Sequence, residues 1–135
     1  CEERIVMAGA RAADLARVAQ GARVLADPAQ GPHVALRLAA QAARHATLLV
    51  VPADAPLVAD ALPALLRAGT NAAAVDGAGI NPLVGLYARA DLLRAMRAPV
   101  RSLQEVVARL DAKRVDVPPG ALRDLDEPQD LSALE

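Results

Sequence analysis

The chain has 135 residues, 54% hydrophobic and 23% charged, with a formal net charge of −1 at pH 7. The large apolar fraction and small net charge exclude a disordered chain. The length predicts one globular domain over residues 1–135. There is no basic block, Tyr87 is the single aromatic residue, and no apolar run approaches the ~20 residues that cross a bilayer, so the composition argues against nucleic-acid and membrane partners. One cysteine, Cys1, excludes an internal disulfide and indicates the reducing cytoplasm.

Strand and helix patterns alternate along the whole chain. In the first part of the chain they predict strands at residues 4–8, 22–26 and 47–51, with helices between them at 12–20 and 32–45. After these come a helix capped by Asp60, strands at 71–75 and 83–87, and a helix capped by Ser102. A strand at 114–117 and a terminal helical turn from Pro128 end the series. The strand at 47–51 is continuously apolar, which is typical of a strand covered on both faces. The alternation predicts a three-layer α/β/α sandwich with a Rossmann-like, mainly parallel sheet.

The stretch VPADAP places one carboxylate just beyond the third predicted strand. Asp54 follows Val51 by three residues and lies between Pro52 and Pro56. Ligands of open α/β sheets bind beyond the carboxyl ends of the strands, and the two prolines restrict the loop's backbone. Asp54 is therefore the first candidate for a binding or catalytic role, beside the alternative that it only makes a turn or caps the next helix.

Two further loops carry acidic residues. Asp27 follows the second predicted strand, and Gly31-Pro32 then opens the apolar helix, whose N-terminal N–H groups suit an anion or a nucleobase edge. Asp124 and Asp126 precede the terminal turn, and turn-making or capping is the alternative for each loop. Three acidic loops together predict a Mg²⁺ site, because Mg²⁺ takes one or two carboxylates plus substrate phosphates.

The order of these motifs resembles the molybdenum cofactor guanylyltransferase family of nucleotidyltransferases. In that family Gly-Pro-Leu opens a buried helix and the following strand ends in Pro-Cys-Asp-x-Pro; here Gly31-Pro32-His33 and the stretch PADAP take those places. The stretch INPLVGLYARADLL is similar to the family's Gln-Pro-Leu-x-x-Leu-Tyr segment, and LRDLDEPQDL to its closing Asn-x-Asn-Thr-Pro-Glu-Asp-Leu. The resemblance covers nearly the whole chain.

The resemblance implies a Mg²⁺-dependent transfer of GMP from GTP onto a phosphorylated acceptor such as molybdopterin, with release of pyrophosphate. It implies that Asp54 is the catalytic carboxylate and holds Mg²⁺ on the nucleotide phosphates, with Asp126 near the same ion. It further implies that Asp27, Gly31 and Pro32 line the nucleotide pocket. Asn81 and Pro82 would border the acceptor.

The chain also departs from the family. The glycine-rich first loop that wraps the triphosphate in the family has no counterpart in these residues, which begin at what would be the family's second strand. We therefore expect either that an upstream segment carries this loop or that the chain is inactive alone, and that the sheet exposes unpaired edges. Ala53, Asp124, Asp126 and Glu127 stand where the family has Cys, Asn, Asn and Thr, which leaves the nucleotide open.

Several alternatives follow. One is the same fold with CTP, which the Asp124-Leu125-Asp126 pattern favours; others are guanylyl transfer to a small phospho-acid and a non-catalytic α/β binding domain. A receiver-like domain is disfavoured, because it needs paired acidic residues after its first strand. Whether the protein is a monomer or a homo-oligomer is left open.

Four other features receive structural interpretations or minor roles. His33 is a lesser catalytic candidate, and Tyr87 is predicted to lie in the core with a partner for its hydroxyl. The Ser102–Glu105 pair predicts a capping box. The arginine-rich residues 89–101 are predicted to form a solvated face.

Overall fold

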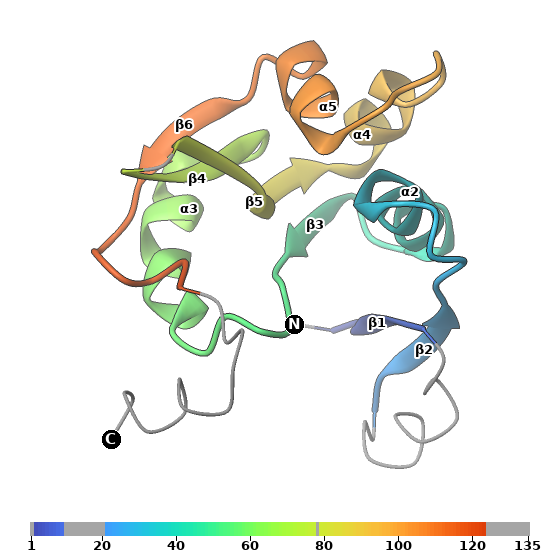
Figure 1. Cartoon of the computed structure of the whole chain (residues 1–135), viewed down its shortest axis with the longest axis horizontal. Helices are drawn as coiled ribbons and strands as arrows, with labels where there is room; N and C mark the ends of the chain where they lie inside the picture. The colour runs from blue at the N-terminus through green and yellow to red at the C-terminus, as the bar shows by residue number, and fades with distance from the viewer. Residues whose placement is uncertain (1, 10–20, 78, 124–135) are drawn as a thin grey trace. The chain divides into compact units, whose positions relative to one another are not determined.

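The structure is a computed structural model that describes residues 2–9, 21–77 and 79–123. Its elements in chain order are β1 (Ile5–Ala8), β2 (Arg23–Ala26), α2 (Pro32–Ala42), β3 (Thr47–Val50), η1 (Val58–Ala61), α3 (Leu62–Ala68), β4 (Ala72–Asp76), β5 (Gly79–Ala88), α4 (Arg89–Ala95), α5 (Leu103–Arg109) and β6 (Lys113–Asp116) (Figure 1). The helix predicted over residues 12–20 and the terminal turn from Pro128 lie outside the described residues.

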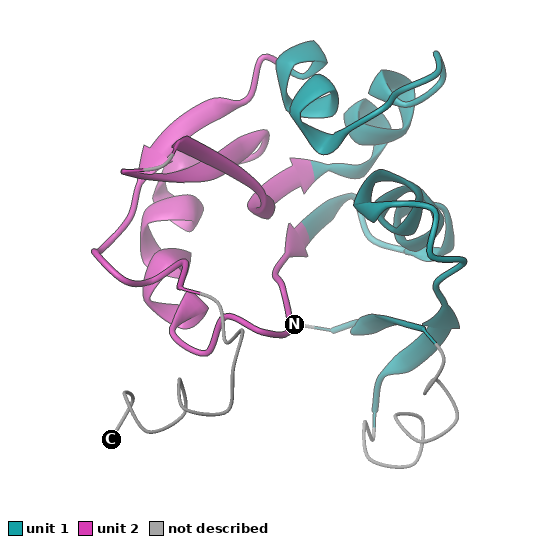
Figure 2. Cartoon of the chain, viewed as in Figure 1, with its two compact units in different colours: residues 1–48, 88–110 teal, residues 49–87, 111–135 magenta. Residues whose placement is uncertain are grey.

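The chain divides into two compact units, which Figure 2 shows in different colours. Unit 1 comprises Cys1–Leu48 and Ala88–Leu110, and unit 2 comprises Leu49–Tyr87 and Asp111–Glu135. Each unit therefore combines two stretches that are far apart in the sequence.

Within its described residues, unit 1 contains a parallel strand pair and the helices α2, α4 and α5. β1 and β2 pair from Ile5↔Arg23 to Ala8↔Ala26. α2 packs against β1, α4 and α5, and α4 packs against α5. Burial of apolar side chains on these helices stabilises the unit. The buried side chains, each at most 7% exposed, are Leu36, Ala40, Leu92, Leu103, Val106 and Val107.

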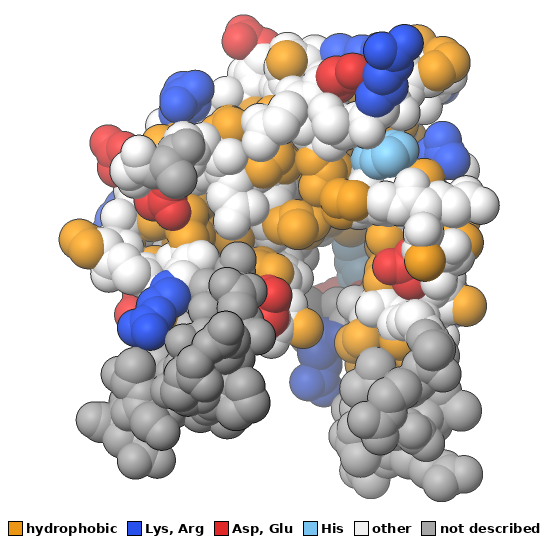
Figure 3. Space-filling view, viewed as in Figure 1, with side chains coloured by type: hydrophobic (Ala, Val, Ile, Leu, Met, Phe, Trp, Pro, Cys, Tyr) orange, Lys and Arg blue, Asp and Glu red, His pale blue; other side chains and the backbone are white. Residues whose placement is uncertain are grey.

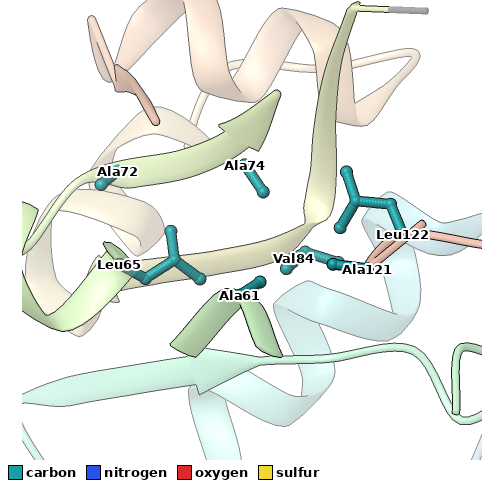
Figure 4. Packing of buried hydrophobic residues seen from close by; sticks show 7 residues of the cluster. All are labelled: Ala61, Leu65, Ala72, Ala74, Val84, Ala121 and Leu122. Atoms are coloured by element: carbon teal, nitrogen blue, oxygen red, sulfur yellow. The ribbon is translucent and has the colours of Figure 1, made fainter. Parts of the chain in front are cut away.

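The larger sheet, in the order β3-β5-β4-β6, belongs mostly to unit 2. β4 lies inside it, parallel to β6 and antiparallel to β5. The three alanines that begin β4 are 0% exposed, and their small side chains suit a strand against which the helix α3 packs closely. Figure 4 shows the cluster that joins these elements: Ala61, Leu65, Ala72, Ala74, Val84, Ala121 and Leu122.

Several predictions about the elements are confirmed. Ser102 caps α5, since its Oγ accepts from the Glu105 N–H at 3.3 Å, and Glu105 Oε2 accepts from the Arg101 N–H at 3.2 Å. Tyr87 is 1% exposed, and its hydroxyl donates to the Pro82 carbonyl. The parallel pairs β1–β2 and β4–β6 agree with a mainly parallel sheet.

Three predictions about elements are wrong. α2 ends at Ala42 instead of residue 45, because Ala43 is already extended. Asp60 lies within η1 and does not cap α3, which follows η1 directly with Ala61 at its N-cap. β5 begins at Gly79 instead of residue 83, because Asp76 of β4 pairs directly with Gly79.

One prediction about burial is confirmed and one is wrong. Arg94, Arg97 and Arg101 are exposed, so the arginines of residues 89–101 do form a solvated face, while the same stretch buries Leu92 and Met96. β3 is not covered on both faces: Leu49 is 43% exposed, and Val51 just after the strand is 46% exposed. β3 lies at the end of the four-stranded order among the described strands, which leaves its outer side without a neighbour there.

Candidate functional site

In unit 1, the candidate residues follow the carboxyl end of β2. The Asp27 N–H donates to the Ala8 carbonyl at 2.8 Å and so continues the pairing of β1 and β2 by one residue. The Asp27 Oδ1 then accepts from the Ala29 N–H at 2.9 Å, and Ala29 has a positive φ of 58°. This is an Asx turn that reverses the chain toward α2. The turn interpretation of Asp27 is therefore correct as far as it goes, and Oδ2 of the half-exposed carboxylate receives no contact from the residues described here.

Gly31 and Pro32 begin α2. Gly31 has φ 107° and ψ 157°, a region that is essentially restricted to glycine. The His33 imidazole folds back over Gly31, so that a Cβ on Gly31 would lie 2.8 Å from His33 Cε1. No side chain caps α2, but Pro32 has no N–H and the Val34 N–H donates to the Gly31 carbonyl at 3.1 Å. Of the first three helical residues, only His33 therefore keeps an N–H that has no partner among the described residues and that could meet an anion. Sequence reasoning considered His33 only as a catalyst; the structure places its ring against the Gly-Pro turn.

In unit 2, Asp54 lies in a turn beyond the carboxyl end of β3. The Asp54 side chain is exposed, whereas the next residue, Ala55, is 3% exposed and anchors the loop. The Ala55 carbonyl also accepts from the Val58 N–H at 3.2 Å, which ties the loop to η1. Within the described part of the chain the Asp54 carboxylate accepts no hydrogen bond, so it does not cap η1 or α3. Asp54 is therefore an exposed carboxylate on an anchored loop.

Asn81 and Pro82 lie inside β5. Asn81 is half-buried, and its Oδ1 accepts from the Leu83 N–H at 3.1 Å. Pro82 is buried, and its carbonyl accepts from the Tyr87 hydroxyl at 2.5 Å. Burial raises the pKa of Tyr87 well above its ordinary value of 10.0, because the phenolate would lose its hydration. The sequence motif located the Asn-Pro pair; the link to Tyr87 required the folded strand.

The structure therefore groups the candidates by unit. Asp27, Gly31 and Pro32 lie in unit 1, while Asp54, Asn81 and Pro82 lie in unit 2. Asp124 and Asp126 lie outside the described residues.

A bound Mg²⁺ would depend largely on the substrate for its ligands. Among the residues that the structure describes, no three His, Cys, Asp or Glu side chains gather into a metal-binding group. Mg²⁺ does not need such a group, since one or two carboxylates together with phosphate oxygens complete its coordination. The exposed Asp54 carboxylate suits this role, because it is a hard oxygen ligand with no competing partner among the described residues.

A second polar cluster lies at the opposite, amino end of β1 and β2. Glu3 pairs with Arg23 at 3.1 Å and accepts from the Arg44 N–H at 2.9 Å. These contacts, the backbone one first, lower the pKa of Glu3 below its ordinary value. The cluster lines a hollow with Glu2, Arg4 and His45, where two glutamates stand against three arginines, so the hollow presents only a small excess of positive charge to a ligand.

On the face that Figure 3 shows, the described residues form no patch of a single charge. In Figure 3, acidic and basic side chains of the described residues are interspersed over the face shown. Every helix within the described ranges is too short or too polar to span a bilayer.

Comparison with known proteins identifies the fold and a family. Residues 1–115 match the family model described as MobA-like NTP transferase domain. A protein from Aquifex aeolicus VF5 has a similar structure, with 17% identity and a TM-score of 0.72 over 91% of this chain and 70% of that one. A 4-diphosphocytidyl-2C-methyl-D-erythritol synthase is similar with 15% identity and a TM-score of 0.70 over 98% and 80%. None of the curated proteins compared matches the chain. The mixed α/β, Rossmann-like fold predicted from the sequence is thereby confirmed.

Proposed function

The chain belongs to the MobA-like NTP transferase domain family, and on that premise we propose that it transfers GMP from GTP to the terminal phosphate of a small-molecule acceptor of the molybdopterin type. The observation that carries the proposal is the Asp54 carboxylate, which is exposed beyond β3 on a loop anchored by the buried Ala55. A carboxylate in this position is available to a cation on a nucleoside triphosphate. The family match runs through both units, which supports one functional domain over residues 1–135.

The proposed reaction exchanges one phosphoanhydride bond for another. An oxygen of the acceptor's terminal phosphate attacks the α-phosphorus of GTP. The bond from that phosphorus to the oxygen bridging the β-phosphate breaks, and pyrophosphate leaves with the bonding electrons. Because no covalent link to the protein is required, the chain's residues align the substrates and offset their charge. When Mg²⁺ is bound, it neutralises charge on the phosphate oxygens.

Each candidate residue has one role in this proposal. Asp54 holds the cation, and Asp126 provides a second carboxylate. Asp27 and the Gly31-Pro32 turn line the nucleotide pocket, where the first turn of α2 offers the His33 N–H as a donor. Asn81 and Pro82 border the acceptor.

CTP is the second candidate donor. The Asp124-Leu125-Asp126 pattern favours CTP, whereas Gly31-Pro32 favours GTP. One structural neighbour is a 4-diphosphocytidyl-2C-methyl-D-erythritol synthase. Because its identity to this chain is 15%, that neighbour supports the fold alone, and experiment must determine the base of the nucleotide donor. Guanylyl transfer to a small phospho-acid keeps the same site with a different acceptor.

The test is pyrophosphate release by the full-length protein with Mg²⁺, molybdopterin, and either GTP or CTP. We expect Asp54→Asn to lower kcat by roughly a hundredfold, because a neutral amide replaces the charge that holds the cation, a loss of the size seen for one preorganised electrostatic contact. The control is Asp60→Asn, an exposed aspartate six residues along in η1, which we expect to leave kcat within about twofold.

Equal activity in wild type and Asp54→Asn would refute the role of Asp54. Turnover with CTP but not with GTP would make CTP the nucleotide donor and leave the assignment as a nucleotidyltransferase unchanged. A protein that binds either nucleotide without releasing pyrophosphate would instead favour the non-catalytic binding domain.

A further inference from the structure

β5 contains a bulge beside the proposed acceptor residues. Ala73 of β4 pairs with Gly85, whereas the next residue, Ala74, pairs with Asn81. Residues 82–84 are therefore extra on β5 at this step of the ladder. The proline among them has no N–H to give to a neighbouring strand, so it suits a bulge.

Two hydrogen bonds hold the bulge in shape. The Tyr87 hydroxyl donates to the Pro82 carbonyl at 2.5 Å, and the Leu83 N–H donates to the Asn81 side chain at 3.1 Å. Because an N–H can only donate, the accepting atom of Asn81 is Oδ1, and its Nδ2 group is turned away from Leu83. That Nδ2 donates to no residue in the described part of the chain. Asn81 is half-buried, and no described residue competes with an oxygen of a ligand for its two N–H donors.

Tyr87 reaches Pro82 by lying over a glycine. Both Tyr87 and Gly85 are buried in β5 and lie two residues apart, on the same face of the strand. A Cβ on Gly85 would lie 2.5 Å from both Cζ and Oη of the Tyr87 ring. No side chain fits beneath the phenol at this distance, so Gly85 is what allows the hydroxyl to reach the bulge.

We propose that Tyr87 is a positioning residue for the acceptor: its hydroxyl fixes the bulge from which the Asn81 amide donates to an oxygen of the acceptor's phosphate. The inference rests on the proposed function and adds a donor and its support to the acceptor side. Removal of the hydroxyl leaves the buried Pro82 carbonyl without this donor, so the bulge relaxes and Asn81 loses its defined direction.

The test compares Tyr87→Phe with wild type in the full-length protein, using GTP, Mg²⁺ and molybdopterin. The ring and its packing remain, and only the hydroxyl is lost. We expect the KM for molybdopterin to rise roughly fivefold, the effect of losing about one hydrogen bond, while the KM for GTP stays within about twofold. The control is Val106→Ala, which creates a cavity at a buried position of α5 in unit 1 and should leave both KM values unchanged after correction for unfolded protein.

A second readout does not need turnover. The Asn81 side-chain amide signals in a nitrogen–proton NMR spectrum are titrated with glycerol 3-phosphate, a simple phosphomonoester. We expect these signals to shift in wild type and to respond more weakly in Tyr87→Phe. Unchanged KM values in Tyr87→Phe would overturn the inference and leave the proposed function intact. A wild type that releases no pyrophosphate would overturn the proposed function, and an identical amide response in both proteins would then overturn this inference as well.

Discussion

The side chain of Tyr87 is buried and its hydroxyl donates to one carbonyl, as is typical of a tyrosine in a core. The single tyrosine of the chain, in the absence of tryptophan, makes this environment directly measurable. The residue's core position was predictable from the apolar run around it. The identity of its partner was not, because Pro82 comes within reach only through the bulge in β5.

Tyr87 should resist ionisation in the folded protein. Burial raises its pKa above the ordinary value of 10.0, so the absorbance at 295 nm should not rise near pH 10 and should rise when urea is added at that pH. Because the folded-state pKa lies above the unfolded one, the contribution to stability is fully present below about pH 10 and is lost as the pH rises further. A folded-state titration with a midpoint at 10 would show that the ring is exposed.

The C-terminal end of α2 depends on two distant arginines. The helix has no basic residue in its own last turn, yet Arg89 donates to the carbonyls of Ala40 at 2.7 Å and Gln41 at 3.2 Å. Arg23 donates to the Ala42 carbonyl at 2.9 Å. These contacts satisfy carbonyls that have no partner within the helix and place positive charge at its negative end. The sequence predicts the helix but not its cap, since the cap comes from β2 and α4.

Arg89→Ala should therefore destabilise the protein. We expect the free energy of unfolding to fall by about 1–3 kcal/mol, because the carbonyls of Ala40 and Gln41 lose a charged donor. The control is Arg94→Ala on the same helix, an exposed residue paired with Asp91 at 2.9 Å, for which we expect a loss below about 1 kcal/mol. Urea unfolding followed by circular dichroism measures both, and equal losses would contradict the capping role.

At the scale of the whole molecule, the exposed edge of the larger sheet is the main liability. β3 ends the order of described strands in that sheet, with the apolar Leu49 43% exposed. An apolar edge strand with unpaired backbone groups is a template for association. The unpaired edge was expected from the family resemblance, whereas the exposure of Leu49 was not, because a continuous apolar run is typical of a covered strand.

The 135-residue chain should accordingly self-associate, and Leu49→Lys should reduce this association by placing a charge on the edge. The control is Leu66→Lys on α3, where the leucine is 64% exposed but lies on a helix. Sedimentation velocity over a range of concentrations measures the effect. A monomeric chain at all concentrations, or an equal effect of both variants, would refute the role of the edge.

The sequence by itself determined the class of fold, most of the strands, and the order of motifs that indicates a nucleotidyltransferase. These properties depend on local patterns: apolar periodicity, proline and glycine at turns, and a carboxylate just beyond a strand. It also located Asp54 and the Asn-Pro segment, because both lie in short motifs.

Only the tertiary structure decided how those motifs are supported. The length of β5, its bulge, the Tyr87–Pro82 bond and the arginine cap of α2 all join residues that are separated in the sequence or depend on register. Register and side-chain reach are set by strand pairing and packing, which no local pattern encodes. The type of most elements could therefore be predicted from the sequence, while the contacts that shape the bulge in β5 arise from the fold.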